Sequence, residues 1–365
     1  MKGIEVNKIY NLDCLEGMKL LDDNSIDSIV TDPPYELSFM NKKWDSTGIS
    51  YNVQLWEECL RVLKPGGHLL AFGGTRTYHR MVCAIEDAGF EIRDQMQWIY
   101  GSGFPKSQNI SKAIDKKFGA KRAKQWDGWG TCLKPANEPI VVARKSISEK
   151  TIADNVLKWG TGGLHIDRCR IPTKDSLNGG AYAKNGTPRD DGWGMQRGGA
   201  GEYVQPTGRF PANVILDEEA GKLLDEQSGI SKSTGGTGEK SRQWDNGIIR
   251  WKGKATGGFG DVGGASRFFY CPKASKKERG EGNNHPTVKP LSLIKYLITL
   301  VTPPGGICLD PFEGSGTHAL ACKDLGFNYI GFELDKTYYN IATKRISDII
   351  PEPEKKLIKT YTSLT

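Results

Sequence analysis

The feature of this chain that most constrains its fold is a turn near residue 314 that contains two glycines. Residues 306–312 form an apolar run typical of a buried strand, and an apolar periodicity after Thr317 predicts a helix. Gly314 and Gly316 lie in the short loop between them. Glycine lets the backbone approach a bound molecule closely, so we expect a small ligand at this strand end of an α/β sheet.

The next predicted strand, residues 329–332, narrows the class of ligand. It ends in Glu333, an acid in the position that binds ribose hydroxyls in nucleoside-binding α/β folds. The loop lacks the Gly-Lys-Ser/Thr of a nucleoside-triphosphate site, and its spacing is shorter than the dinucleotide fingerprint. A nucleoside without phosphates, such as S-adenosylmethionine, is therefore the predicted cofactor.

Strands and helices alternate along the first 145 residues, which predicts an α/β fold with a mostly parallel sheet. The predicted strands cover residues 8–13, 26–30, 68–74, 90–100 and 138–144, and the predicted helices cover residues 14–21, 53–63 and 78–88. A Lys-Pro-Gly-Gly sequence at residues 64–67 predicts a turn that ends the second helix.

A candidate catalytic motif, Asp32-Pro33-Pro34-Tyr35, directly follows the second predicted strand. The prolines fix the backbone dihedral φ, so a neighbouring carbonyl stays aimed as a hydrogen-bond acceptor. Asp32 and that carbonyl can accept hydrogen bonds from an exocyclic amine. Tyr35 can stack on the aromatic ring that carries the amine. The alternative is a strand that ends in an ordinary proline turn.

The two motifs together resemble the amino-methylating DNA methyltransferases that use S-adenosylmethionine. Asp-Pro-Pro-Tyr comes early, and Asp-Pro-Phe-Glu-Gly-Ser-Gly-Thr (310–317) comes late, after His-Pro-Thr-Val-Lys-Pro (285–290). This order is that of the family's β group, in which the target-recognition segment separates the two halves. The resemblance covers residues 5–145 and 266–346.

The resemblance implies a Rossmann-like methyltransferase core with permuted motif order and an inserted recognition region. We expect a catalytic half at residues 1–145, a target-recognition insertion at 146–265, a cofactor-binding half at 266–350 and a C-terminal tail at 351–365. It also implies that the cofactor contacts Asp13, Thr287, Lys289, Asp310, Phe312, Gly314, Gly316, Thr317 and Glu333. On local grounds Asp13 is equally an N-cap of a helix, and Lys289 is equally the residue before a helix start.

The segment 146–265 is rich in glycine and in arginine and lysine, with tryptophan and tyrosine interspersed. Such residues suit phosphates and guanine edges, so we expect duplex DNA to bind here. The predicted DNA contacts, which include a lysine cluster after residue 270, are Arg168, Arg170, Arg242, Arg250, Lys273, Lys276 and Lys277. A solvated basic insertion is the alternative for the segment.

Composition agrees with a nucleic-acid partner, since the formal net charge is +7.

The eight cysteines show neither a Cys-x-x-Cys pair nor a zinc-type spacing, so we predict free thiols and no metal site. No membrane-length apolar stretch or signal-peptide core is visible, which predicts a cytoplasmic protein. Dimers are frequent in the family; a homodimer and a cognate restriction endonuclease both stay open as partners.

The expected reaction begins with extrusion of one base from the duplex, because a stacked amine cannot meet a methyl group in line. Tyr35 would stack on that base and Asp32 would accept from its amine. The resemblance favours N6 of adenine, since Asp at the first motif position accompanies adenine in the family and Ser accompanies cytosine. Open alternatives are N4 of cytosine, an amine of RNA or protein, and a DNA-binding protein without transfer activity.

Overall fold

The computed structural model of this chain describes residues 3–37, 43–103, 105, 107–173, 177, 205–232, 241–245, 248–252, 262–272 and 288–347. The chain divides into two compact units. The first comprises Met1–Leu164, Asn213–Ala220 and Cys271–Thr365, and the second comprises His165–Ala212 and Gly221–Tyr270. The predicted tail, residues 351–365, lies outside the described residues.

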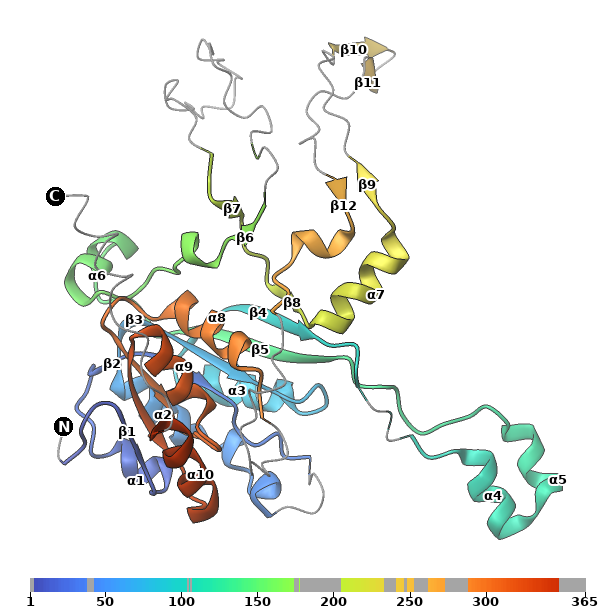
Figure 1. Cartoon of the computed structure of the whole chain (residues 1–365), viewed down its shortest axis with the longest axis horizontal. Coiled ribbons are helices and arrows are strands. Elements are labelled where there is room, and N and C mark those ends of the chain that lie inside the picture. The colour runs from blue at the N-terminus through green and yellow to red at the C-terminus, as the bar shows by residue number, and fades with distance from the viewer. Residues whose placement is uncertain are drawn as a thin grey trace. The chain divides into compact units, whose positions relative to one another are not determined.

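The first unit is built on an eight-stranded sheet in the order β1-β14-β13-β2-β3-β5-β4-β8 (Figure 1). The strands are β1 (Lys8–Tyr10), β2 (Ile26–Thr31), β3 (Leu63–Phe72), β4 (Glu91–Ile99), β5 (Asn137–Arg144), β8 (Val214–Leu216), β13 (Ile307–Asp310) and β14 (Asn328–Phe332). Every neighbouring pair is parallel except the two that β5 makes with β3 and β4. The prediction of a mostly parallel α/β sheet is therefore confirmed.

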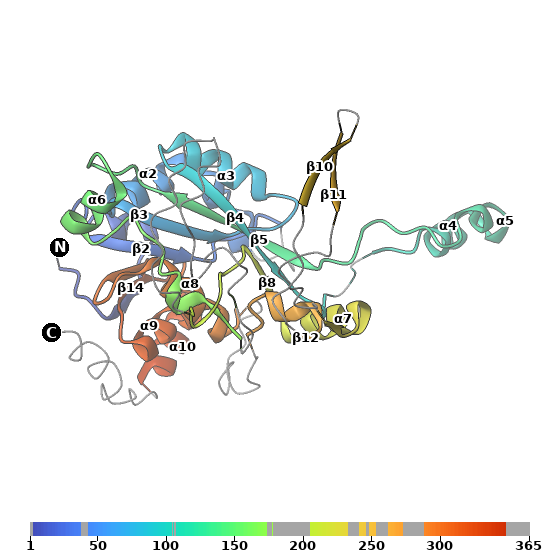
Figure 2. The ribbon, with the colours of Figure 1, turned by 90° about the horizontal axis from the view of Figure 1, so that it is seen from above.

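Helices cover both faces of this sheet. α2 (Val53–Val62) and α3 (Tyr78–Asp87) lie on one face, and α8 (Leu291–Val301) and α9 (Thr317–Leu325) lie on the other (Figure 2). Other helices of this unit are α1 (Cys14–Met18), α6 (Ile152–Trp159) and α10 (Lys336–Ser347), together with α4 (Ile110–Phe118) and α5 (Ala120–Ala123), which lie between β4 and β5 in the chain. Parallel strands need such crossover connections, so this layering follows from the strand–helix alternation in the sequence.

The helix α2 shows how the sequence forms these elements. The Asn52 side chain caps its first turn by accepting from the Gln54 amide at 3.0 Å. Leu55, Trp56, Cys59 and Val62 then recur at helical spacing and are completely buried against the sheet. The predicted helix end is confirmed, but the predicted turn at residues 64–67 is wrong. Those residues already belong to β3, where an irregularity in the pairing with β2 accommodates them.

A buried carboxylate, Asp27, ties together strands from both halves of the chain. It accepts from the Lys64 ammonium at 2.6 Å and from the Ile307 backbone amide at 2.7 Å. Only 4% of Asp27 is exposed, so both contacts are largely shielded from water. The side chain on β2 thereby fixes the adjacent β3 and the start of β13, which comes 280 residues later.

Among the described residues of the second unit, three short antiparallel pairs of strands occur. β6 (Ile171–Pro172) pairs with β7 (Gly208–Arg209), β10 (Ser241–Asp245) with β11 (Ile248–Lys252), and β12 (Val262–Gly263) with β9 (Ser231–Lys232). Its limits differ from the predicted insertion, residues 146–265, in three places. The second unit extends to Tyr270, beyond the predicted end. Residues 146–164 and the strand β8 belong to the first unit, because α6 packs on β3 and β8 adds to the edge of the main sheet.

Among the described residues, every helix is too short or too polar to cross a lipid bilayer.

Replacing Asp27 by alanine should lower the free energy of unfolding by about 3 kcal/mol, because it removes a buried ion pair and leaves the Ile307 amide without its acceptor. Asp27→Asn keeps an acceptor for that amide and should cost about half as much. Urea unfolding followed by circular dichroism measures both variants. An unchanged midpoint for Asp27→Ala would show that this link is dispensable.

Candidate active site

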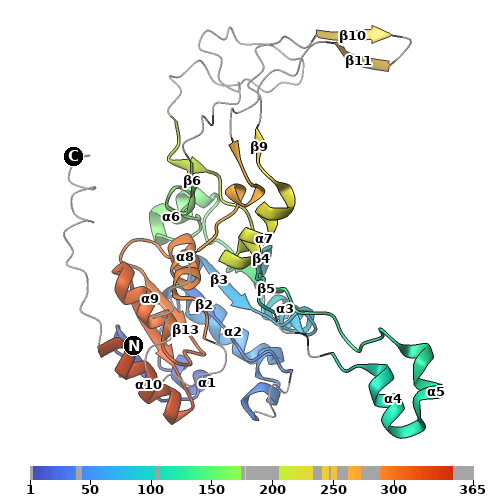
Figure 3. The same ribbon diagram turned by 45° about the vertical axis from the view of Figure 1, so that its right-hand side comes forward.

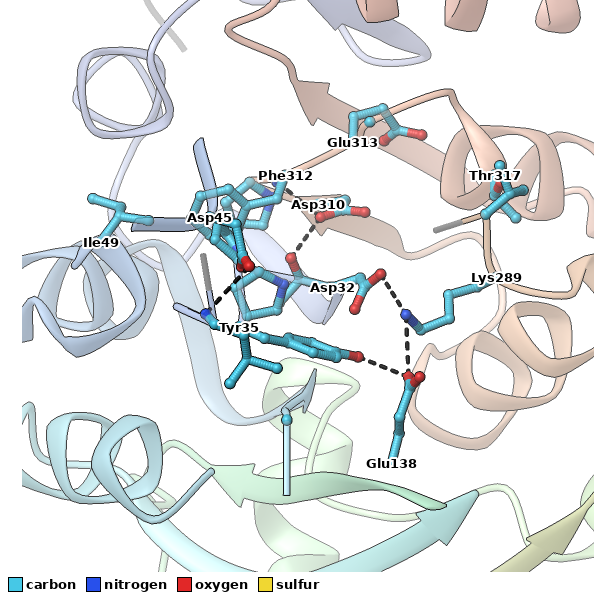
Figure 4. A pocket seen from close by; sticks show the side chains of 18 of the residues that line it. Asp32, Tyr35, Asp45, Ile49, Glu138, Lys289, Asp310, Phe312, Glu313 and Thr317 are labelled. Atoms are coloured by element: carbon cyan, nitrogen blue, oxygen red, sulfur yellow. Dashed lines mark hydrogen bonds and ion pairs between the residues drawn. The ribbon is translucent and has the colours of Figure 1, made fainter. Parts of the chain in front are cut away.

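A cavity of roughly 1440 Å³ opens at the carboxyl ends of β2, β13 and β14. Open α/β sheets bind ligands at this edge. Both halves of the chain line the cavity, because β13 and β14 lie between β1 and β2 in the sheet. The predicted catalytic motif and most of the predicted cofactor residues therefore share one cavity (Figure 4).

Asp32 is the first residue after β2, and its two carboxylate oxygens differ in their surroundings. Oδ2 accepts from the Lys289 ammonium at 2.6 Å. Oδ1 is buried and has no hydrogen-bond partner within the described part of the chain. A buried acceptor without a partner is costly, so Oδ1 is suited to accept from a group that enters the cavity.

Lys289 lies between two carboxylates (Figure 4). Its ammonium is 2.6 Å from Asp32 Oδ2 and 3.2 Å from Glu138 Oε2, and only 8% of the residue is exposed. Burial alone would lower the pKa of Lys289, but the charges of Asp32 and Glu138 raise that pKa above its ordinary value. The ammonium also lies 5.2 Å from the centre of the Tyr35 ring. Lys289 is thus a permanent cation at the centre of the site.

Tyr35 is held at both ends. Its hydroxyl donates to Glu138 Oε2 at 2.7 Å, and its backbone carbonyl accepts from the Thr77 hydroxyl at 2.7 Å. Burial, followed by the charges of Asp32 and Glu138, raises the pKa of Tyr35 well above its ordinary value. The side chain therefore stays a neutral phenol with a fixed ring plane.

The strand β13 leads into the predicted cofactor loop through Asp310. Asp310 Oδ1 accepts from the Thr31 hydroxyl at 2.6 Å and from the Phe312 amide at 2.9 Å. Burial and the nearby charge of Glu313 raise the pKa of Asp310 to about 8. Thr31 immediately precedes Asp32, so this hydrogen bond joins the two motifs directly.

The glycine loop adopts backbone conformations that favour glycine. Gly314 has φ +57° and Gly316 has φ +87°. A Cβ on Gly316 would also approach the Ala342 backbone of α10 to 2.9 Å. Gly314 lines the cavity, whereas Gly316 begins α9 and serves the packing of that helix.

Glu333 follows β14 and closes the cofactor side of the cavity. Its Oε2 accepts from the Gly314 amide at 2.8 Å and its Oε1 from the Asp335 amide at 2.7 Å. Burial nevertheless raises the pKa of Glu333 to about 7. Each oxygen keeps a further lone pair for a ligand hydroxyl. Asp13 caps α1 by accepting from the Leu15 and Glu16 amides, which confirms its interpretation as an N-cap. It also lines the cavity, and its contact with a cofactor stays a prediction.

The predicted cofactor and catalytic residues that line the cavity are Asp13, Asp32, Pro33, Pro34, Tyr35, Lys289, Asp310, Phe312, Gly314, Thr317 and Glu333. Thr287 lies outside the described residues. Lys289 contacts Asp32 and Glu138, so its predicted contact with a cofactor carboxylate stays a prediction.

The predicted DNA contacts lie apart from this cavity in the sequence, and their role stays a prediction. Arg168 is exposed, and Arg170 donates to Asp167 at 2.7 Å and to the Gly208 carbonyl at 3.1 Å. Arg242 and Arg250 occupy the paired strands β10 and β11. Lys273, Lys276 and Lys277 lie outside the described residues.

Glu138 is the site residue that sequence reasoning missed. The local sequence predicts only that Glu138 belongs to a core strand, which the structure shows as β5. Because β5 alone runs against its neighbours, its amino end lies at the carboxyl ends of β2 and β3. A predicted strand that begins with an acid signals a site only once its direction is known.

Three of the cysteine and histidine side chains gather behind the cofactor loop. Ligand-type atoms of Cys308, His318 and Cys322 all lie within 4.8 Å of one another, although their spacing matches no zinc motif. His318 bonds with Glu313 at 3.0 Å through Nδ1 and with Cys322 at 3.6 Å through Nε2. These hydrogen bonds hold the buried cluster together, and His318 also contributes to the lining of the cavity.

The chain belongs to a family of DNA amino-methylases. Residues 26–344 match the N6/N4 methyltransferase family model, described as DNA methylase. Among curated relatives, the type II methyltransferase M.HindIII of Haemophilus influenzae is 24% identical over 384 residues, with 93% of this chain and 95% of that protein covered. M.HpaI of Haemophilus parainfluenzae is 25% identical, with 91% of this chain and 71% of that protein covered.

A solved structure shows the same fold. The PvuII DNA methyltransferase, described as cytosine-N4-specific, aligns over 99% of this chain and 95% of its own with a TM-score of 0.50 and 14% identity. The protein is accordingly an amino-methylating DNA methyltransferase with this family's α/β fold.

Proposed function

We propose that this protein is a site-specific methyltransferase that methylates the N6 amine of adenine in duplex DNA, with S-adenosylmethionine as the donor. Family membership supports DNA amino-methylation, and N6 of adenine is the finer proposal. The observation that carries methylation of an amine is Asp32 Oδ1, a buried acceptor without a partner among the described residues, beside the fixed ring of Tyr35. The choice of adenine rests on Asp at the first position of the motif, which accompanies adenine in the family. N4 of cytosine is the alternative, since it carries the same kind of amine.

The residues of the cavity fit S-adenosylmethionine. Glu333 offers acceptors for two ribose hydroxyls, and Gly314 allows close approach of the backbone. When bound, this cofactor supplies an electrophilic methyl group on a positively charged sulfur. Carboxylic acids dominate the lining, which suits a cation: Asp13, Asp32, Asp45, Glu138, Asp310, Glu313, Glu333 and Asp335 against Arg76, Lys134 and Lys289.

In the proposed mechanism, the two oxygens of Asp32 have separate tasks. Oδ2 stays bonded to Lys289, which fixes the orientation of the carboxylate. Oδ1 accepts a hydrogen from the amine of an extruded base and directs the nitrogen lone pair away from the ring plane. When the new N–C bond forms, the sulfur–methyl bond of the donor would break, and the proton lost by the amine would pass to its hydrogen-bond acceptor, Asp32 Oδ1. No covalent bond between base and protein is required.

Tyr35 provides the surface for the extruded base. Unstacking a base costs a few kcal/mol, and an aromatic contact recovers about 1–3 kcal/mol. Because Glu138 holds the phenol oxygen at 2.7 Å, the ring is already oriented before a base enters. Glu138 is therefore a positioning residue for Tyr35 and, through Lys289, for Asp32.

Sequencing of DNA from a methylation-free host that expresses this chain tests the proposal. We expect N6-methyladenine at one short motif and its absence with Asp32→Ala, which should lower transfer by at least ~10²-fold while cofactor and DNA binding persist. N4-methylcytosine would replace the N6 proposal with the alternative. Near-normal methylation by Asp32→Ala would remove Asp32 from the mechanism.

The raised pKa of Glu333 predicts that cofactor affinity depends on pH. With a pKa of about 7, Glu333 is mostly protonated at pH 6 and mostly ionised at pH 8. The ionised form is the better acceptor for ribose hydroxyls, so affinity for S-adenosylmethionine should rise roughly tenfold over this interval. Titration calorimetry of wild type and Glu333→Gln checks this, since the variant lacks the titrating group. Parallel pH profiles in the two proteins would contradict the assignment.

Lys289→Met distinguishes two roles for this lysine. If Lys289 orients Asp32, kcat should fall by ~10²-fold while the Kd for S-adenosylmethionine changes less than ~3-fold. We expect this pattern, and we expect Lys289→Arg, which keeps the charge, to retain more activity. A raised Kd with an unchanged kcat would instead assign Lys289 to the carboxylate of the cofactor. Thermal unfolding of both variants controls for damage to the fold.

A further inference from the structure

A helical arm, residues 107–134, extends from the sheet of the first unit between β4 and β5 (Figures 1 and 3). It contains α4 (Ile110–Phe118), α5 (Ala120–Ala123) and the 3-10 turn η4 (Lys124–Trp126). The arm falls within the predicted catalytic half, residues 1–145, and the predicted DNA contacts all come later in the chain.

The arm is closed at its base by hydrogen bonds between its two ends. Asn109 forms a β-bridge with Gly130, and the Ile110 amide donates to the Trp129 carbonyl at 3.1 Å. The Gln108 amide donates to the Thr131 hydroxyl at 2.9 Å. These contacts connect residues about 20 positions apart, so the arm is a defined substructure.

Inside the arm, a small apolar face holds the helices together. Ile110, Ala113 and Ile114 lie on one side of α4 and are partly buried, and Ala123 of α5 is only 3% exposed. The Trp126 and Trp129 rings pack edge to face with centres 5.5 Å apart. This internal packing leaves the polar side of both helices in solvent.

The solvent side is strongly basic. Residues 107–134 contain seven basic and two acidic side chains, a net charge of +5 where the whole chain has +7. The exposed cations of the helical part are Lys112, Lys116, Lys117, Lys121, Arg122 and Lys124. Within the described part of the chain, none of these six forms an ion pair with a carboxylate. Six unneutralised cations on a 28-residue arm repel one another, and a polyanion removes that repulsion.

The arm is continuous with the active-site cavity. Its last residues, 131–134, line the cavity, and the chain then passes through Pro135 into Glu138, which holds Tyr35. Trp129 and Phe118 are each 60% exposed beside the cations. A basic surface with exposed aromatic rings suits phosphates and sugars that flank a base in the cavity.

We infer that the arm is a DNA-binding element that grips the phosphate backbone of the substrate duplex beside the extruded base. The inference rests on DNA as the substrate, and it holds whichever base is methylated. The contact is to phosphates, so it contributes affinity and position without reading sequence.

The test uses a variant in which Lys116, Lys117, Lys121 and Arg122 are changed to glutamine. A matched control changes four exposed lysines elsewhere in the first unit, Lys8→Gln, Lys19→Gln, Lys150→Gln and Lys344→Gln, for the same loss of charge. Fluorescence anisotropy with a labelled duplex gives the DNA Kd across a salt series, and the slope of log K against log[salt] counts phosphate contacts.

We expect the arm variant to lose about 0.9 from that slope for each contact removed, roughly 2–4 in total, and to bind DNA at least ~10-fold more weakly at 0.1 M salt. The control variant should keep the DNA affinity and the salt slope of the wild type. In the arm variant, kcat at saturating DNA and the affinity for S-adenosylmethionine should stay near wild type. Lys116→Arg, Lys117→Arg and Lys121→Arg together should preserve binding. If the arm variant shows the same slope and DNA affinity as the control variant, the inference is overturned. Unchanged DNA binding together with loss of self-association in sedimentation would also overturn it, because the arm would then bind a second copy of the chain.

If the fourfold variant unfolds early, single changes at Lys116 and Lys121 decide the question, since each should lower the slope by about 0.9. If the proposed target base is wrong, the slopes still differ, so the two proposals fail separately.

Discussion

The hydrogen bond from the Thr31 hydroxyl to Asp310 Oδ1 is the contact on which the site depends. It is 2.6 Å long, it is buried, and it joins residues 279 positions apart. Thr31 ends β2 and Asp310 ends β13, and the two strands pair in parallel, with Ile29 opposite Leu309. The residues that follow each strand therefore enter the same cavity. The pairing makes neighbours of a catalytic motif and a cofactor loop from opposite ends of the chain, and the Thr31–Asp310 hydrogen bond fixes the two strand ends to each other.

β5, which runs antiparallel to both of its neighbours in the main sheet, brings Glu138 to the cavity. The carboxyl ends of β2, β13 and β14 bring Asp32, Asp310 and Glu333 to the cavity. Asp310 and Glu333 accept hydrogen bonds from neighbouring groups, whereas Asp32 pairs with a buried cation, Lys289, at 2.6 Å. Glu138, delivered by the amino end of β5, contacts the same ammonium at 3.2 Å. The reversal of one strand thus completes the charge balance around Asp32.

Most of the fold and much of the site follow from local patterns in the sequence. The helix periodicity at residues 53–62, the acid after β14 and the Asp-Pro-Pro-Tyr motif each depend on neighbours within a few residues, so they can be predicted. The role of Glu138 depends on the direction of β5 among seven other strands, which no local pattern contains. The Lys64–Gly67 segment was misread for a similar reason. Proline and glycine favour a turn locally, but here residues 64–67 form a bulge inside β3, between the pair of Ile26 with Leu63 and the pair of Ser28 with His68.

The cavity lining is acidic and the arm is basic, so the two attract ligands of opposite charge. An acidic lining favours a cationic methyl donor, but it disfavours phosphates by the same Coulombic effect. A base that enters such a cavity must leave its own phosphates outside, where cations have to hold them. The arm presents six exposed cations on residues that lead directly into the cavity wall. The cations that attract the DNA phosphates and the carboxylates that attract the cationic methyl donor thus occupy different places. Neither group therefore weakens the attraction that the other exerts.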